Sequence, residues 1–242
     1  MNRLQRVTIA PPREGGDRYP FSVPAVQATA QLEFSTAVTF FVGENGSGKS
    51  TLLEGLAAKL RLPTVGSMST EEDATLLHAR QLGAAMKLTW GRAGRAHRGF
   101  FLRAEDFFGF TKSLAMQQSA LLRERAEIEV EYAERSAEAK KLRLGPVENS
   151  LAAMRRRYGE DFDAQSHGEG FLSLFKARFV PDGLYLLDEP EAALSPTSQL
   201  ALLAMMADMV REGGQFIVAT HSPILLALPG ATIWSFDERP PR

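Results

Sequence analysis

Gly43-Glu44-Asn45-Gly46-Ser47-Gly48-Lys49-Ser50 is the stretch of this sequence that decides the fold. It follows the run 37–42, whose apolar, β-branched and aromatic residues predict a strand buried on both faces. It leads into the helical pattern of 50–62, in which four leucines fall on one face before Pro63 ends the helix. The spacing G-x-x-x-x-G-K-S indicates a phosphate-binding loop when it lies between a strand and a helix start. The sequence therefore predicts such a loop inside an α/β domain.

The residue types of this loop suit a nucleotide bound together with Mg²⁺. Glycines allow the backbone to wrap, so that successive N–H groups and the helix N-terminus face a polyphosphate. Lys49 can reach the β- and γ-phosphates, which makes it a candidate catalytic residue, and the Ser50 hydroxyl can hold the cation. The expected binding residues are Gly43, Glu44, Asn45, Gly46, Ser47, Gly48, Lys49, Ser50 and Thr51.

Composition limits the classes of protein to consider. The 242 residues are 44% hydrophobic and 24% charged, which is typical of one globular domain, here residues 1–242 with a modest subdomain. The net charge of −1 gives no general sign of a nucleic-acid or membrane partner. The absence of cysteine excludes disulfides and thiolate metal sites. No apolar run approaches the roughly 20 residues of a membrane helix, so we expect a cytoplasmic protein without direct membrane insertion.

Polar residues follow two further apolar runs. The run 183–187 ends on Asp188 and Glu189, and carboxylates at the end of a buried strand are costly unless they meet cations or water. Asp188 fits a Mg²⁺ partner and Glu189 a general base for an attacking water; the alternative is an acidic helix cap. His221 ends the run 215–220 and is interpreted as a γ-phosphate contact, with a structural histidine as the alternative.

The remaining segments complete an α/β pattern. Buried strands that alternate with helices predict a largely parallel sheet. The strand-like stretches 86–90 and 99–104 are joined by a turn containing glycine and arginine, as in a hairpin. Residues 114–157 are rich in Ala, Glu, Arg and Leu and predict helices interrupted at Gly145-Pro146. We interpret 112–165 as a helical subdomain inserted in the domain.

The order of these motifs resembles the ATP-binding-cassette (ABC) ATPase superfamily over about residues 35–225. The resemblance implies a P-loop fold with a mostly parallel central sheet, an antiparallel β subdomain and a helical insert. It also implies ATP as the nucleotide. Ser166, 22 residues before Asp188, stands where the family carries its signature, and His221 lies 32 residues after Glu189. By resemblance, Ser166 and Gly168 would bind ATP held by a second copy, so a homodimer is expected.

This sequence departs from the family pattern at several positions. His167 and Glu169 replace a glycine and a glutamine of the signature. The segment 102–106 has no glutamine where the family has one, and Glu105 there is either a Mg²⁺ or water ligand or part of an acidic turn. The aromatic residue that stacks on adenine could be Tyr19 or Phe21, although an ordinary packing role is favoured for both.

With these departures and its Glu191-to-Pro196 segment, the sequence resembles stand-alone ATPases that are grouped with repair, recombination, toxin–antitoxin or defence cassettes. We therefore favour a cytosolic ATPase that dimerises around two ATP molecules, with an unidentified protein partner. One alternative is the ATPase subunit of a transporter, whose helical insert should expose an apolar patch. Another is a DNA-binding genome-maintenance ATPase. Two groups of arginines support this alternative, but arginines on solvated helix faces would give the same pattern. A regulator that hydrolyses poorly is disfavoured by Glu189. The arginines are Arg92, Arg95, Arg98, Arg155, Arg156 and Arg157.

Overall fold

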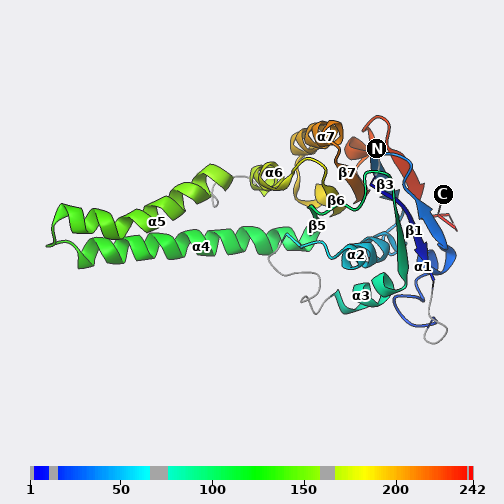
Figure 1. Ribbon diagram of the computed structural model, residues 1–242, viewed down its shortest axis with the longest axis horizontal. Helices are drawn as coiled ribbons and strands as arrows, with labels where there is room; N and C mark the ends of the chain where they lie inside the picture. Colours follow the sequence, from blue (N-terminus) through cyan, green and yellow to red (C-terminus); the bar gives the residue numbers. More distant parts are fainter. Residues whose placement is uncertain (1–2, 11–15, 66–75, 159–166, 239, 242) are drawn as a thin grey trace.

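The computed structural model describes residues 3–10, 16–65, 76–158, 167–238 and 240–241. A central sheet of five strands has the order β5-β6-β7-β3-β8, and all of its pairings are parallel. The parallel sheet expected from the alternation of strands and helices is therefore confirmed (Figure 1). Its strands are β3 (Val38–Val42), β5 (Gly99–Arg103), β6 (Leu184–Asp188), β7 (Gln215–Ala219) and β8 (Thr232–Ser235).

The two faces of this sheet bury alternate residues of each strand. In β6, Leu184 and Leu186 pack on the side of helix α2 and a second sheet, whereas Tyr185 and Leu187 pack on the side of helices α6 and α7. Each such buried side chain contributes about 1.5–3 kcal/mol to folding, so the register of the strand ends is well determined. The helices against the sheet are α2 (Lys49–Leu60), α6 (His167–Arg178), α7 (Pro196–Arg211) and α8 (Pro223–Leu226).

The second sheet is antiparallel, with the order β2-β1-β4. It corresponds to the antiparallel subdomain that the family resemblance implies. Its hydrophobic face shares one core with α2 and the central sheet. The elements of this part are β1 (Leu4–Ile9), α1 (Pro24–Ala28), β2 (Gln31–Glu33), α3 (Leu77–Ala84) and β4 (Met86–Trp90).

The hairpin expected between 86–90 and 99–104 is wrong, because β4 and β5 belong to different sheets. The burial of the two strands gives the physical reason. β4 alternates between buried and exposed residues, as in a half-solvated antiparallel sheet, whereas β5 is buried nearly throughout, as in a parallel one. Gly99 allows β5 to approach β6, since a Cβ at that position would lie 1.8 Å from the carbonyl oxygen of Leu184.

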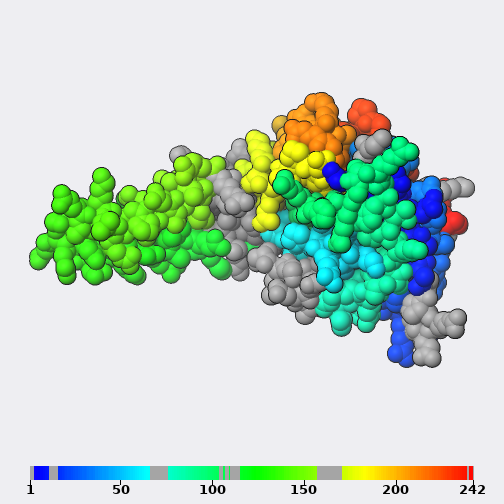
Figure 2. Space-filling view, viewed as in Figure 1, coloured from blue at the N-terminus to red at the C-terminus, as the bar shows by residue number. Residues whose placement is uncertain are grey.

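Two long helices, α4 (Ala104–Glu131) and α5 (Ala137–Tyr158), form an arm that projects from the body (Figures 1 and 2). The described part of the insert is helical, as expected. That residues 112–165 form a subdomain stays a prediction. The interruption expected at Gly145-Pro146 is wrong: α5 continues through Pro146, and the chain turns at 132–136 instead. A small apolar cluster on both sides of the proline packs α5 on α4 and holds the helix together, namely Ile128, Leu144, Val147 and Leu151.

No helix within the described ranges is both long enough and apolar enough to cross a membrane.

Candidate nucleotide-binding and catalytic site

The glycine-rich loop joins the end of β3 to the start of α2, as the sequence predicted. Gly48 directly precedes the helix and has a φ of +103°, in the left-handed region. A Cβ on Gly48 would lie 2.8 Å from Val23 Cγ1 and 2.9 Å from Ala25 Cβ. Both the positive φ and this lack of space require a glycine at this position. Gly48 therefore leads the loop directly into the N-terminus of a twelve-residue helix, and the first N–H groups of a helix have no acceptor within it and can bind an anion.

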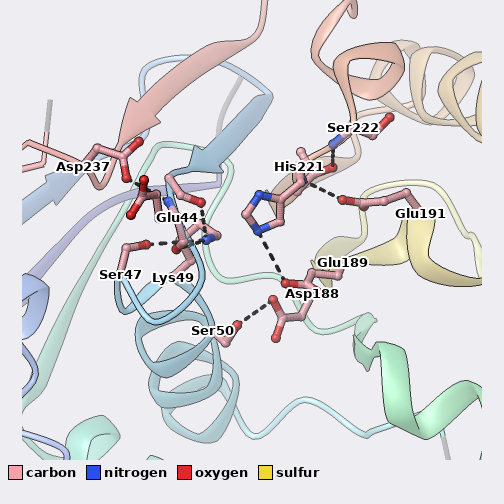
Figure 3. Close-up of polar contacts among 12 residues, drawn as sticks. Glu44, Ser47, Lys49, Ser50, Asp188, Glu189, Glu191, His221, Ser222 and Asp237 are labelled. Atoms are coloured by element: carbon pink, nitrogen blue, oxygen red, sulfur yellow. Dashed lines mark hydrogen bonds and ion pairs between the residues drawn. The ribbon is translucent and has the colours of Figure 1, made fainter.

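Lys49 is folded over this loop. Its side chain is buried, and Nζ donates hydrogen bonds to the carbonyl oxygens of Gly43 at 2.6 Å and Glu44 at 2.9 Å (Figure 3). Burial lowers the pKa of Lys49, and the carboxylates of Glu189 and Asp188 oppose that effect. The ammonium group is thus held inside the loop and faces the acidic residues.

Asp188 lies at the end of β6 and meets the first turn of α2. Ser50 Oγ donates a hydrogen bond to Asp188 Oδ1 at 3.1 Å (Figure 3). Burial raises the pKa of Asp188 to about 7, and the hydrogen bond from Ser50 opposes this shift. A buried carboxylate beside a hydroxyl is an oxygen donor set that suits Mg²⁺, and the cation would relieve the cost of ionising Asp188.

Glu189 and His221 follow β6 and β7, which are neighbouring parallel strands, so their side chains meet at the same edge. His221 Nε2 lies 3.7 Å from Glu189 Oε1, and both side chains are about two-fifths exposed (Figure 3). Glu189 has a φ of +47°, which is uncommon for a residue other than glycine, and its N–H donates to the Ala219 carbonyl oxygen at 2.9 Å. Backbone strain of this kind is concentrated at functional sites.

A comparison with protein families identifies the chain. The family model described as "AAA domain, putative AbiEii toxin, Type IV TA system" matches residues 88–227, which is more than half of the sequence. A second model, described as "AAA domain", matches residues 25–61, around the phosphate loop.

The chain belongs to the first of these families. It is an ATPase of the ABC type, as the order of its motifs indicated.

Curated relatives of the ATPase carry ATP-binding names. The chain is 29% identical over 209 residues to "Cytochrome c biogenesis ATP-binding export protein CcmA" of Rhodospirillum rubrum, covering 83% of this chain and 74% of that protein. It is 28% identical to "Hemin import ATP-binding protein HmuV" of Nocardia farcinica, over 86% of this chain and 65% of that protein. It is 25% identical to "Macrolide export ATP-binding/permease protein MacB" of Pectobacterium atrosepticum over 74% of this chain, which spans only 25% of that longer protein.

The fold of the ATPase is also found among solved structures. A nucleotide-free ATP-binding cassette from an ABC transporter aligns with a TM-score of 0.50 and 15% identity, covering 99% of this chain and 90% of that one. At this identity the match shows the fold: a P-loop α/β domain with a parallel sheet, an antiparallel sheet and a helical insert.

The structure of the ATPase brings together five of the residues singled out in its sequence: Lys49, Ser50, Asp188, Glu189 and His221. Others stand apart. Ser166 lies outside the described residues, and Gly168 is the second residue of α6. Glu105 is in the first turn of α4, and its side chain lies outside the described part of the structure, so both interpretations of it stay predictions.

The two aromatic candidates for adenine differ in the ATPase. Phe21 is buried in the core between the sheets, which is the packing role that was favoured. Tyr19 is half exposed and meets His78 edge to face, with ring centroids 4.9 Å apart. Among the described residues, Tyr19 is therefore the one of the two that keeps an accessible ring.

Three residues that sequence reasoning left without a role contact this site. Asp237, after β8, accepts a hydrogen bond from the Glu44 N–H at 2.7 Å. Glu191 accepts from the N–H of His221, and Gln199 accepts from the hydroxyl of Ser222. The contact of Asp237 with the phosphate loop follows from the strand order, which places β8 beside β3 and which the sequence alone does not reveal. An open hollow of about 490 Å³ adjoins the loop there, lined by Glu44, Asn45, Gly46, Ser47, Phe236 and Asp237.

Proposed function

We propose that this ATPase hydrolyses Mg²⁺-ATP at a site that two copies of the chain complete. The observation that carries the proposal is the convergence at one sheet edge of the Ser50–Asp188 contact and the Glu189–His221 pair, next to Lys49. These groups supply a cation-binding pair, a base, a phosphate contact and a fixed positive charge within a single site.

The first role of the chain is to hold the triphosphate. Backbone N–H groups of the glycine-rich loop and of the α2 N-terminus donate to phosphate oxygens. Lys49 exchanges the carbonyl oxygens that it contacts now for the β- and γ-phosphates. Ser50 and Asp188 hold Mg²⁺, which neutralises charge on the phosphate oxygens when it is bound.

The second role is to direct water. Glu189 accepts a proton from the water whose oxygen forms a bond to the γ-phosphorus, while the bond from that phosphorus to the bridging oxygen of ADP breaks. His221 donates a hydrogen bond to the γ-phosphate, close to the carboxylate of Glu189. Phosphate and ADP are the products.

Replacement of the base tests this mechanism. Glu189→Gln keeps the size of the side chain but cannot accept the proton, so turnover should fall by about 100-fold or more while ATP binding persists. Lys49→Ala should instead weaken ATP binding. Phosphate release and fluorescent-nucleotide titration measure the two effects. A Glu189→Gln variant with wild-type turnover would remove Glu189 from the catalytic role.

Dimerisation is the second part of the proposal. By family resemblance, Ser166 and Gly168 of one copy contact the ATP of the other. ATP with Mg²⁺ should therefore convert the Glu189→Gln variant from monomer to dimer, as measured by light scattering. A matched Lys49→Ala/Glu189→Gln variant should stay monomeric. If the Glu189→Gln variant remains monomeric with saturating ATP, the composite site is wrong.

We propose that the dimer acts as an ATP-driven switch in a cytoplasmic process such as defence or repair. The description of the matched family, which names a toxin–antitoxin system, supports this class of process. A pull-down with the Glu189→Gln variant and ATP tests it, because that variant should hold the state in which partners bind. Recovery of a membrane transport protein in place of a cytoplasmic partner would contradict it.

A second candidate is an ATPase that acts on a separate membrane protein through its arm. The names of the curated relatives, which describe export and import, favour this reading. The arm also exposes large apolar side chains, as a docking helix would need. A Val130→Ser/Leu142→Ser variant should then lose a membrane partner in the same pull-down while keeping its ATPase rate. The exposed side chains are Met116, Leu122, Val130 and Leu142.

Contact with DNA has less support. Arg92, Arg95 and Arg98 are exposed between β4 and β5, but Arg95 already contacts the carbonyl oxygen of Leu60 at 3.5 Å. Arg155 and Arg156 are exposed on α5, a different element. A titration with duplex DNA at low salt tests this candidate, and an absence of binding there would exclude it.

A further inference from the structure

We infer that Glu191 is a positioning residue for His221, holding the backbone of the histidine so that the imidazole ring reaches the γ-phosphate. This inference rests on the proposed function, because it assigns Glu191 a part in the reaction that Glu189 and His221 carry out.

The contact between Glu191 and His221 is short and involves a charged group. Glu191 Oε1 accepts a hydrogen bond from the His221 backbone N–H at 2.6 Å (Figure 3). Charge-assisted hydrogen bonds of this length are among the stronger ones in proteins. The donor is the first N–H after Thr220, where the β7 ladder has ended, so sheet pairing does not fix it. The Glu191 carboxylate supplies the partner that the sheet no longer provides.

The path of the chain explains why Glu191 can reach this point. Glu189 adopts a left-handed conformation, with φ +47° and ψ +52°, and the short 3₁₀ helix η2 (Pro190–Ala193) starts directly after it. That turn sends the side chain of Glu189 toward the imidazole of His221 and the side chain of Glu191 toward its main chain (Figure 3). The two carboxylates therefore contact the same histidine at different atoms.

The next residue is fixed from the same segment. Ser222 Oγ donates to Gln199 Oε1 at 2.5 Å, and Gln199 Nε2 donates to the Leu194 carbonyl oxygen at 3.0 Å. Two consecutive residues, His221 and Ser222, are thus held by side chains from the region that follows the acidic pair. Loss of Glu191 alone would leave the Ser222 contact in place and free the backbone of His221.

The other oxygen of Glu191 argues against a role in stability alone. Glu191 Oε2 is buried and makes no hydrogen bond to any residue that the structure describes. A carboxylate with one buried, unsatisfied oxygen costs free energy, and such groups in folded proteins call for a functional reason. Positioning the histidine beside the reacting phosphate is a reason consistent with the contact that the first oxygen makes.

Kinetics of three variants test the inference. Glu191→Ala removes the acceptor and should lower kcat by about tenfold or more while leaving KM for ATP within about twofold, because misplacement of a group at the reacting phosphate affects the transition state most. Glu191→Gln retains an oxygen that can accept from the His221 N–H and should recover most of kcat. Glu148→Ala, a matched loss of an exposed glutamate on α5, should behave as the wild type.

A double variant separates positioning from general damage. His221→Ala alone should reduce kcat, and Glu191→Ala added to it should cause no further loss if Glu191 acts only through His221. Equal losses from Glu191→Ala in both backgrounds, or a change in KM alone, would overturn the inference. Circular dichroism checks the fold; if Glu191→Ala does not fold, Glu191→Asp, one methylene shorter, takes its place with a smaller expected effect.

A readout that needs no turnover keeps this test distinct from that of the proposed function. The ring of His221, one of four histidines and assigned by its loss in His221→Ala, is followed by NMR on addition of Mg²⁺ and a non-hydrolysable ATP analogue. Its resonance should move in the wild type and in Glu191→Gln, and much less in Glu191→Ala. A wild-type shift that Glu191→Ala retains contradicts the inference alone. A wild-type resonance that does not move contradicts the proposed function itself.

Discussion

Asp188 carries an electrostatic cost that should be visible in the stability of the nucleotide-free protein. Its carboxyl is nearly fully buried, and its pKa is raised from 3.8 to about 7 by that burial. Well below pH 3.8 the group is protonated in both the folded and the unfolded chain. As pH rises toward 7, the unfolded chain releases this proton first, so the folded state loses stability in that window and does not regain it above.

Asp188→Asn should remove this pH dependence. The variant keeps an oxygen acceptor for Ser50 but has no charge to bury, so its advantage over the wild type should grow from pH 4 to pH 8, reaching on the order of 2–4 kcal/mol. Urea unfolding in EDTA at several pH values measures the difference. A constant difference across that range would show that Asp188 does not titrate as proposed.

Gly48 and Gly46 form a matched pair in the phosphate loop. Both have positive φ, but a Cβ on Gly48 would press on Val23 and Ala25, whereas a Cβ on Gly46 meets nothing within 4 Å. Gly48→Ala should therefore destabilise the protein by about 2–4 kcal/mol, and Gly46→Ala by about 1 kcal/mol. Urea unfolding of the two variants tests this, and equal losses would contradict the steric argument.

At the scale of elements, the arm depends on a very small core. Among the side chains that the structure describes, a few apolar ones join α4 to α5 beyond the body, so much of the stability of the arm should come from them. This explains why the sequence misled at Pro146: helix propensity predicts a break there, but tertiary contacts on both sides of the proline keep the helix continuous.

Leu144→Ala should loosen the arm without affecting the sheet. Leu144 is buried between the helices, and its truncation should cost about 2–3 kcal/mol locally. Hydrogen exchange measured by mass spectrometry should then speed up across α4 and α5, with β6 and β7 unchanged. Leu142→Ala is the control, because Leu142 is 82% exposed and its truncation should leave exchange as in the wild type. Faster exchange in β6 or β7 would show that the arm and body unfold together.

At the scale of the whole molecule, the site is made by the edge of the central sheet, where segments distant in the sequence end side by side. Ser50 and Asp188 are 138 positions apart and lie within hydrogen-bond distance. A ligand that binds them joins α2 to β6, and so should stabilise the entire body by mass action.

ATP with Mg²⁺ should therefore raise the stability of the wild type by about 2.7 kcal/mol at a concentration 100 times the dissociation constant. Removal of the cation by EDTA should abolish most of that gain. Asp188→Asn should show a smaller difference between Mg²⁺ and EDTA, because one oxygen donor has lost its charge. Thermal unfolding in the two buffers measures this effect, and equal stabilisation with and without Mg²⁺ would argue against a cation site at Ser50 and Asp188.

The sequence by itself determined the phosphate loop, the strand that ends on Asp188 and Glu189, and the strand before His221, because these motifs combine local backbone requirements with continuous apolar runs. Only the tertiary structure decided that β4 and β5 belong to different sheets, that α5 runs through Pro146, and that Glu191 and Gln199 hold the His221–Ser222 segment. The physical reason is the range of the forces involved. Turn chemistry and hydrophobic runs act between neighbours in the sequence, whereas strand order, helix packing and the partner of a single backbone N–H depend on which distant segments meet.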